Sequence, residues 1–229
     1  MKIALLGKGK TGSKVIELAK NSNHQVSIFD KENRPTLEKL TGHDVIISFL
    51  PGAPFLELIP LLLETKLPLV TGSTGFEWPI ELDQELKNAK QTWIWGHNFS
   101  MGINLVKACL EVLGKAKKLF PEATFDINEI HHTQKRDSPS GTALSFQNWL
   151  SHDCKITSER TGDVVGIHQL NIKTDFEQIH LEHKALDRSI FANGAIYAAT
   201  MMIEKKNTNC KIANGLLNFS TFMEQIIDL

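Results

Sequence analysis

Short apolar runs alternate with amphipathic stretches through the first hundred residues of the chain. The runs have the length of buried strands and lie at 2–6, 25–29, 45–50, 67–71 and 92–95. Between them, helical spacing of apolar residues predicts helices at 13–19, 55–64 and 81–89, with room for a short helix near 36–40. Pro60 predicts a kink or an interruption in the helix at 55–64. This alternation is typical of a Rossmann-like α/β domain, in which helices cover both faces of a parallel sheet.

The pattern changes after residue 100. It predicts a long amphipathic helix over 101–120, a strand over 123–132 and a helix that opens at Ser140. Strands at 164–172 and 179–185 and a helix at 191–204 follow, so this part predicts a smaller α+β domain. Apolar residues near the C-terminus predict that this segment packs against the first domain; they are Leu216, Leu217, Phe219, Phe222, Ile226 and Ile227.

The expected division is therefore an α/β domain of residues 1–99 with 190–229, and a smaller domain of residues 100–189. The composition excludes some classes of binding partner. With 229 residues, 41% of them hydrophobic, and a net charge of -1, the chain has enough apolar material for a core and no basic field for nucleic acid. It holds no apolar run near the roughly 20 residues that cross a membrane. Cys109, Cys154 and Cys210 form no metal-like pair, so we expect reduced thiols, a cytoplasmic protein and no metal site.

A glycine-rich loop follows the first predicted strand and opens the first helix. It reads Gly7, Lys8, Gly9, Lys10, Thr11 and Gly12. In this context, Gly-x-Gly-x-x-Gly indicates a dinucleotide site, since the glycines bring backbone amides against a pyrophosphate. Asp30 ends the second strand 18 residues after Gly12, close to the roughly 20 expected for an acid that binds a ribose hydroxyl. The neighbouring Lys31 suits a ribose phosphate, so NADH and NADPH both remain open, beside the alternative of a turn without ligand.

Residues 129–143 hold a dense group of proton-transfer and anion-binding side chains. His131, His132 and Lys135 lie within five residues of one another and can donate protons near neutral pH. After a turn, Ser140, Gly141 and Thr142 open a helix, whose first amides and dipole favour a carboxylate or a phosphate. Polar surface followed by an ordinary helix cap is the alternative interpretation. The adjacency of both features instead predicts a proton donor beside a clamp for an anionic substrate.

Further motifs accompany these two. They are Gly72-Ser73-Thr74-Gly75-Phe76, residues 98–104, residues 160–168, His183-Lys184-Ala185 and residues 188–195. Through these motifs and residues 129–143, the chain resembles the dihydrodipicolinate reductase family. The resemblance implies that His131 and Lys135 are the catalytic acid groups, and that His132 with Ser140, Gly141 and Thr142 holds a substrate carboxylate. It also implies that residues 7–12, Asp30 and Lys31 line the nicotinamide cofactor, together with Gly72, Ser73, Thr74, Gly96, His97, Asn98 and Phe99.

The implied reaction is the NADH- or NADPH-dependent reduction of dehydrated 4-hydroxy-tetrahydrodipicolinate to tetrahydrodipicolinate, in lysine and diaminopimelate biosynthesis. Three departures from the family pattern are visible: a shorter phosphate loop, an abbreviated stretch after the second strand, and a missing part of the substrate domain before Arg160. They leave the cofactor preference open. They also keep two alternatives, a related reductase of another small dicarboxylate or amino acid and a non-catalytic dinucleotide-sensing regulator. The resemblance further implies that residues 1–99 with 190–229 are a dinucleotide-binding domain and residues 100–189 a substrate and oligomerisation domain. It also implies a homo-oligomer, a tetramer or alternatively a dimer.

Overall fold

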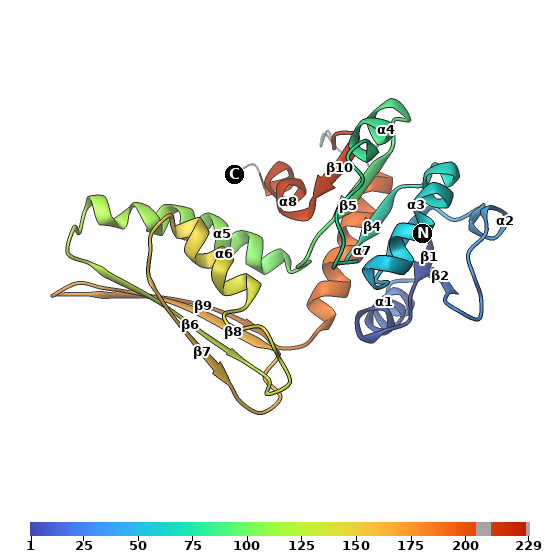
Figure 1. Ribbon diagram of the computed structural model, residues 1–229. Helices are drawn as coiled ribbons and strands as arrows, with labels where there is room; N and C mark the ends of the chain where they lie inside the picture. The colour runs from blue at the N-terminus through green and yellow to red at the C-terminus, as the bar shows by residue number, and fades with distance from the viewer. Residues whose placement is uncertain (205–211, 228–229) are drawn as a thin grey trace. The chain divides into compact units, whose positions relative to one another are not determined.

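The computed structural model describes residues 1–204 and 212–227, and the chain divides into two compact units (Figure 1). The first unit comprises Met1–Ser100 and Ser189–Leu229, and the second comprises Met101–Arg188. Cys210 and part of the predicted 190–229 segment lie outside the described residues. Within the described ranges, no helix is long and apolar enough to cross a bilayer.

The first unit is built on a six-stranded sheet in the order β10-β5-β4-β3-β1-β2, with every neighbouring pair parallel. Its strands are β1 (Lys2–Leu6), β2 (Gln25–Phe29), β3 (Val45–Ser48), β4 (Leu69–Thr71), β5 (Thr92–Trp95) and β10 (Gly215–Asn218). β1, β3, β4 and β5 are buried along almost their whole length, as expected of strands covered on both faces. The predicted parallel sheet is thus confirmed, although β3 and β4 are shorter than the predicted strands 45–50 and 67–71.

Helices cover both faces of this sheet. On one face, α3 (Gly52–Thr65) and α4 (Leu82–Asn88) bury apolar side chains against β1, β3, β4 and β5. On the other, α7 (Ser189–Glu204) contacts β3 and β4, and α1 (Lys10–Asn21) packs against α7. The remaining helices of this unit are α2 (Leu37–Leu40) and α8 (Phe219–Ile227). This arrangement confirms the predicted Rossmann-like α/β architecture.

The predicted interruption at Pro60 is wrong, because α3 is a single helix from Gly52 to Thr65. A proline inside a helix removes one N–H donor and crowds the preceding turn, which costs about 3 kcal/mol. Phe55, Ile59 and Leu62 of the same helix are at most 6% exposed. Since full burial of each such side chain contributes roughly 1.5–3 kcal/mol, packing on the sheet outweighs the local preference.

The C-terminal apolar residues pack within the first unit, as predicted. β10 pairs in parallel with β5, and the Leu216 N–H donates to Asp83 Oδ1 at 2.9 Å. Phe219 and Phe222 at the start of α8 are at most 1% exposed. The ring of Phe219 lies 4.6 Å from that of Phe99, so this segment supports the loop that follows β5.

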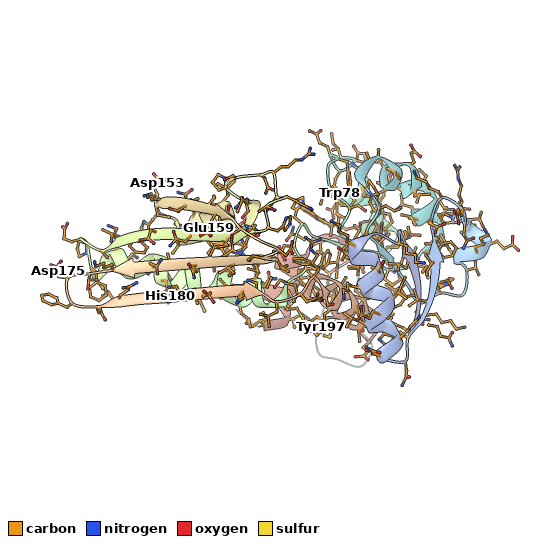
Figure 2. The ribbon with its side chains drawn as sticks, turned by 90° about the horizontal axis from the view of Figure 1, so that it is seen from below. Trp78, Asp153, Glu159, Asp175, His180 and Tyr197 are labelled. Carbon is orange, nitrogen blue, oxygen red and sulfur yellow. The ribbon has the colours of Figure 1, made fainter. Side chains whose placement is uncertain are left out.

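The second unit contains a four-stranded mixed sheet in the order β7-β6-β8-β9. β6 (Thr124–His131) is parallel to β7 (Lys155–Arg160) and antiparallel to β8 (Gly166–Lys173), which pairs with β9 (Gln178–Ala185). β7 is absent from the predicted strands because its sequence, Lys-Ile-Thr-Ser-Glu-Arg, contains a single apolar residue. Figure 2 shows Glu159 on β7 and Asp175 in the turn between β8 and β9.

Two helices, α5 (Met101–Leu113) and α6 (Gly141–Leu150), pack their apolar side chains with those of β6 and β8 in one core. The predicted helix over 101–120 ends early, and Gly114–Lys118 form a 3₁₀ turn, η1. A Cβ at Gly114 would lie 2.2 Å from the Leu150 carbonyl oxygen, so the chain passes very close to the end of α6. Glycine also has a low helix propensity. The apolar periodicity beyond Leu113 shows neither this low propensity nor the close approach to α6.

Candidate active site

The glycine loop joins β1 to α1 in a tight turn. Gly7 has a φ of +94°, in the left-handed region that favours glycine. A Cβ at Gly12 would lie 2.1 Å from the Gly7 carbonyl oxygen, so the helix start touches the end of the strand. Gly9 is the N-cap residue; a Cβ there would meet only open space, and no side chain caps the helix. The first amides of α1 are therefore available to an anion, with the exposed Lys8 and Lys10 beside them.

The loops that follow β4 and β5 lie at the same edge of the sheet, because all these strands are parallel. Gly72 starts one of them and faces the Phe49 ring, where a Cβ would come within 2.4 Å. Its neighbour Ser73 is buried, with its Oγ 3.3 Å from that of Ser48, and Thr74 follows. Gly96 starts the other loop, which runs through His97 and Asn98 to the buried Phe99. The strand ends thus bring all the predicted cofactor residues to one edge.

The loop after β3 belongs to this edge, although it was not among the predicted cofactor residues. Gly7 lies against it, since a Cβ there would be 3.1 Å from Leu50 Cδ2 and 3.3 Å from the Phe49 carbonyl oxygen. β1 lies between β2 and β3, so the strand order reverses at this point, which is where open α/β sheets bind ligands. The Pro51-Gly52 pair after an apolar strand was the available sequence signal.

Asp30 follows β2 and caps a turn through its side chain. Its Oδ1 accepts hydrogen bonds from the N–H groups of Glu32, at 2.9 Å, and Asn33, at 3.0 Å. These bonds hold the pKa of the Asp30 carboxyl below its ordinary value, so it is charged at neutral pH. Both bonds use Oδ1, which leaves Oδ2 as an acceptor of the kind that a ribose hydroxyl needs. Lys31 beside it is exposed.

In the second unit, the strand β6 ends on His131, and the chain then turns to reach α6. The Thr161 N–H donates to the His131 carbonyl oxygen at 2.8 Å and fixes this strand end. Lys135 is held close by, since its N–H donates to the His132 carbonyl oxygen at 3.1 Å. Its Nζ pairs with Asp137 Oδ1 at 2.9 Å. Because Asp137 is more than half exposed, this pair is of the weak surface kind that a substrate carboxylate can replace.

His132 contacts an arginine that sequence reasoning missed. Its Nε2 lies 3.2 Å from Nη2 of Arg188. A guanidinium can only donate, so this nitrogen of His132 accepts and the ring carries its proton on Nδ1. Arg188 therefore adds a positive charge next to the predicted carboxylate-binding residue.

The helix α6 begins as predicted, with Ser140 as its N-cap. The Ser140 Oγ accepts from the Ala143 N–H at 3.2 Å and also lies 3.3 Å from His168 Nε2. Ser140 is 2% exposed, so its hydroxyl is committed to the protein interior. The exposed Gly141 and the half-buried Thr142 follow at the first helical positions. Their amides have no partner within the helix, which leaves them to bind an anion.

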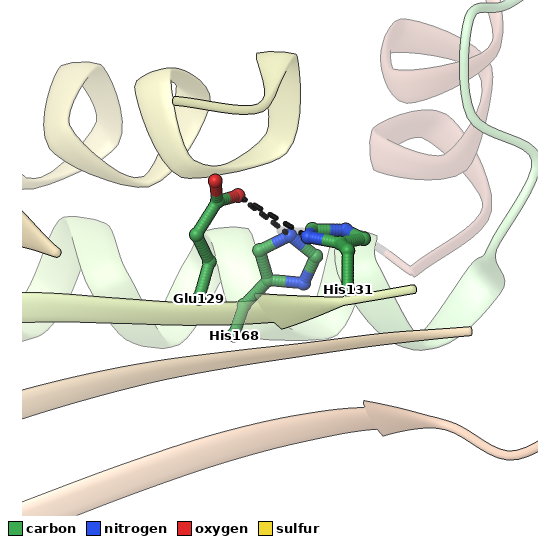
Figure 3. Close-up of side chains that lie close together, drawn as sticks. All are labelled: Glu129, His131 and His168. Carbon is green, nitrogen blue, oxygen red and sulfur yellow. Dashed lines mark ion pairs between the residues drawn. The ribbon is translucent and has the colours of Figure 1, made fainter. Parts of the chain in front are cut away.

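Glu129, His131 and His168 form a buried cluster behind this helix end (Figure 3). Glu129 Oε2 lies 3.5 Å from His131 Nδ1 and 3.9 Å from His168 Nε2. Its other oxygen, Oε1, accepts from the Ser140 N–H and from Arg160 Nη2, each at 3.0 Å. Glu129 and His168 were not predicted as site residues. The available signal was the spacing of Glu129 and His131, which puts both side chains on one face of a strand.

Burial and charge set the protonation of this cluster. Burial alone would raise the pKa of Glu129, but hydrogen bonds from Ser140, Ser158 and Arg160 outweigh it and leave that pKa below its ordinary value. Burial lowers the pKa of His131, and Glu129 opposes this effect. Burial, followed by the neighbouring His131, lowers the pKa of His168 to about 3. At neutral pH the cluster therefore holds one carboxylate and a neutral His168.

Among the described residues, these three side chains are also the one group able to offer three metal ligands. Their ligand atoms lie within 4.8 Å of one another, and one carboxylate with two imidazoles is a donor set that zinc uses. Sequence reasoning predicted no metal. Arg160 lies 3.0 Å from the same carboxylate, so a dication here would meet a fixed positive charge. The cluster is better suited to a proton donor with a carboxylate beside it.

Comparisons with known proteins cover both units of the chain. The family model for the N-terminal part of dihydrodipicolinate reductase matches residues 1–99, and that for the C-terminal part matches residues 102–216. The chain belongs to the dihydrodipicolinate reductase family. The junction between the two family models coincides with the junction of the compact units at Ser100 and Met101, and the N-terminal part is the dinucleotide-binding domain of the family.

Curated relatives in the dihydrodipicolinate reductase family support this assignment. The 4-hydroxy-tetrahydrodipicolinate reductase of Thermosipho africanus is 31% identical over 209 residues, which cover 90% of this chain and 94% of that protein. The reductase of the same name from Christiangramia forsetii is 31% identical over 225 residues, which cover 90% of this chain and 93% of that one. The predicted family is confirmed, as is the class of reaction, an NAD(P)H-dependent reductase of lysine and diaminopimelate biosynthesis.

Solved structures agree on the fold. A dipicolinate-bound dihydrodipicolinate reductase from a Paenisporosarcina species superposes with a TM-score of 0.75 at 21% identity, over 95% of this chain and 97% of that one. The DAP dehydrogenase of C. glutamicum gives a TM-score of 0.53 at 12% identity, over 96% and 93% of the two chains. The dihydrodipicolinate reductase fold is thus shared in outline by another dehydrogenase.

Proposed function

We propose that this chain reduces the dehydrated form of 4-hydroxy-tetrahydrodipicolinate to tetrahydrodipicolinate, with His131 and Lys135 as its acid groups. Family membership supports the reaction, and the geometry of the second unit supports the residue roles. The proposal depends mainly on one observation: His131, Lys135 and the open start of α6 all lie within residues 131–142. A substrate that bears carboxylates and accepts a proton needs this combination.

The first unit binds the cofactor in this proposal. The start of α1 at residues 7–12 receives the pyrophosphate, and Asp30 with Lys31 faces the adenine ribose. Gly72, Ser73, Thr74 and residues 96–99 line the remainder of the site. When bound, NADH or NADPH supplies the hydride. The open space around Gly9 and the free Oδ2 of Asp30 support this fit.

The second unit binds the substrate and supplies the proton. The amides of Gly141 and Thr142 and the neighbouring His132 hold one carboxylate, with Ser140 shaping the helix start from inside. The negative charge of the substrate replaces Asp137 as the partner of Lys135 and favours the protonated form of His131. After hydride addition to the conjugated imine, the substrate carries excess electron density and must take up a proton. His131 or Lys135 donates that proton.

The test is cofactor oxidation by the purified protein while the unstable substrate forms in the cuvette. A synthase makes it from pyruvate and aspartate semialdehyde, and NADH and NADPH are run separately. Oxidation that requires both precursors is the expected result, and the two rates rank the cofactors. A folded protein that binds cofactor and oxidises none would overturn the proposal in favour of a related reductase or a regulator.

Two further proposals concern the protein as a whole. A homo-tetramer follows from the family resemblance, with a dimer as the alternative, and light scattering on the purified protein distinguishes them. A cytoplasmic location is supported by the unpaired thiols of Cys109 and Cys154 among the described residues. Fractionation of cells that produce the protein tests this location.

A further inference from the structure

The catalytic role proposed for His131 requires one ring nitrogen to face the substrate, and the buried side of the ring determines which. His131 Nδ1 faces Glu129 Oε2 at 3.5 Å. Within the described part of the chain, neither atom has a hydrogen-bond partner, and both are shielded from solvent. Two such complementary atoms facing each other are one small rotation away from a hydrogen bond.

Glu129 is held rigidly at this position. Its Oε1 accepts from the backbone of Ser140 and from the Arg160 guanidinium, and its side chain is fully buried. The sheet register explains the convergence, since Glu129 lies opposite Ser158 on β7 and opposite His168 on β8. Oε1 is thus held by Ser140 and Arg160, and Oε2 faces His131.

His168 also lies beside His131 and Glu129, and it is not charged. Its ring packs edge-on against that of His131 at 5.0 Å, and its Nε2 lies 3.3 Å from Ser140 Oγ. Because burial keeps it neutral, the imidazolium that Glu129 can stabilise is that of His131.

We propose that Glu129 is the positioning residue for His131, the proton donor, and that it also holds the start of α6, the proposed binding site for the substrate carboxylate. Its Oε2 keeps a proton on His131 Nδ1, so that Nε2 faces outward and exchanges the catalytic proton. Its Oε1 holds the Ser140 backbone, and with it the start of α6. This inference rests on the proposed function, since it assumes that His131 donates the proton.

The same arrangement identifies opposing influences on His131. Burial lowers the pKa of His131, Glu129 raises it, and the positive charges of Lys135 and Arg160 lower it. Glu129→Gln keeps the side-chain volume and removes the negative charge, while Arg160→Gln removes one of the opposing positive charges. A role limited to holding the fold would make both variants less stable and would give no reason for opposite pKa changes.

The experiment follows each histidine by ¹⁵N NMR across a pH titration, with a chelator present to keep metal ions off the three potential ligands. His131 is identified by the signal lost in His131→Asn. The unaltered protein is expected to show His131 with its proton on Nδ1. In Glu129→Gln the pKa of His131 falls, because the neighbouring negative charge is removed, and in Arg160→Gln it rises. Glu182→Gln, the same change at an exposed position of β9, is the control and leaves the pKa of His131 unchanged.

Turnover gives the second readout. In Glu129→Gln, the fall of kcat/KM on the basic side of the pH profile moves to lower pH, because a general acid must be protonated. A proton on Nε2 in the unaltered protein, or an unchanged His131 pKa in a folded Glu129→Gln variant, overturns the inference. If that variant does not fold, the tautomer of His131 in the unaltered protein decides between these outcomes. An unaltered enzyme without turnover would instead overturn the proposed function.

Discussion

The two units bind charge by different means. At the sheet edge of the first unit, the candidate cofactor site is mainly backbone: a loop of glycines, the amides of α1, and turns against Leu50 and Phe49. In the second unit, the candidate proton donor His131 lies beside a buried carboxylate, with a second histidine and an arginine around that carboxylate. The first site should therefore be sensitive to added volume, and the second to changed charge.

Lys135→Ala should have the largest effect. It removes a proposed acid group and lowers turnover by roughly 100-fold or more, while cofactor affinity stays the same because Lys135 is not among the residues proposed to bind the cofactor. Steady-state kinetics and cofactor titration measure the two quantities. Lys173→Ala, on the exposed end of β8, is the matched control. Near-normal turnover of Lys135→Ala would remove the lysine from the mechanism.

Gly12→Ala should weaken cofactor binding on the order of tenfold, or about 1.4 kcal/mol. The added methyl meets the Gly7 carbonyl oxygen at 2.1 Å, so the helix start must shift. Gly9→Ala places its methyl in open space in the protein without cofactor, and so tests whether a ligand fills that space. Isothermal titration with NADH and NADPH is the measurement. Unchanged affinity in both variants would show that this loop does not hold the pyrophosphate.

His168 should make the protein sensitive to acid. Its pKa is about 3 in the folded protein against an ordinary value of 6.5, so below pH 6.5 the unfolded chain takes up a proton that the folded chain refuses. The free energy of unfolding therefore falls as the pH drops from 6.5 toward about 3. Urea denaturation at several pH values measures this slope, and His168→Gln should flatten it. His180→Gln, on the exposed β9, should not, and equal slopes in all three proteins would contradict the buried neutral state.

Most of the first unit could be predicted from sequence because β1, β3 and β4 are largely apolar runs and its glycine loop lies in consecutive residues. Packing decided what local rules could not, as at Pro60. The second unit was harder. β7 has one apolar residue, and α5 ends just before Gly114, which passes very close to Leu150.

The cluster of the second unit shows why its chemistry was only partly predictable. His131, Lys135 and the start of α6 are close in sequence, and the pattern of residues 129–143 indicates them directly. His168 and Arg160 reach Glu129 only through the pairing of β6 with β8 and β7. Such partners depend on strand register, which periodicity does not specify when one strand is mostly polar.

Hydride transfer to a cyclic imine held by the second unit can be followed by isotope labelling. The cofactor is deuterated at the transferable position of the nicotinamide, the substrate is generated in place, and the product is examined by mass spectrometry. We expect tetrahydrodipicolinate that carries one deuterium. Cofactor that binds but delivers no deuterium, in the presence of authentic substrate, would contradict this expectation.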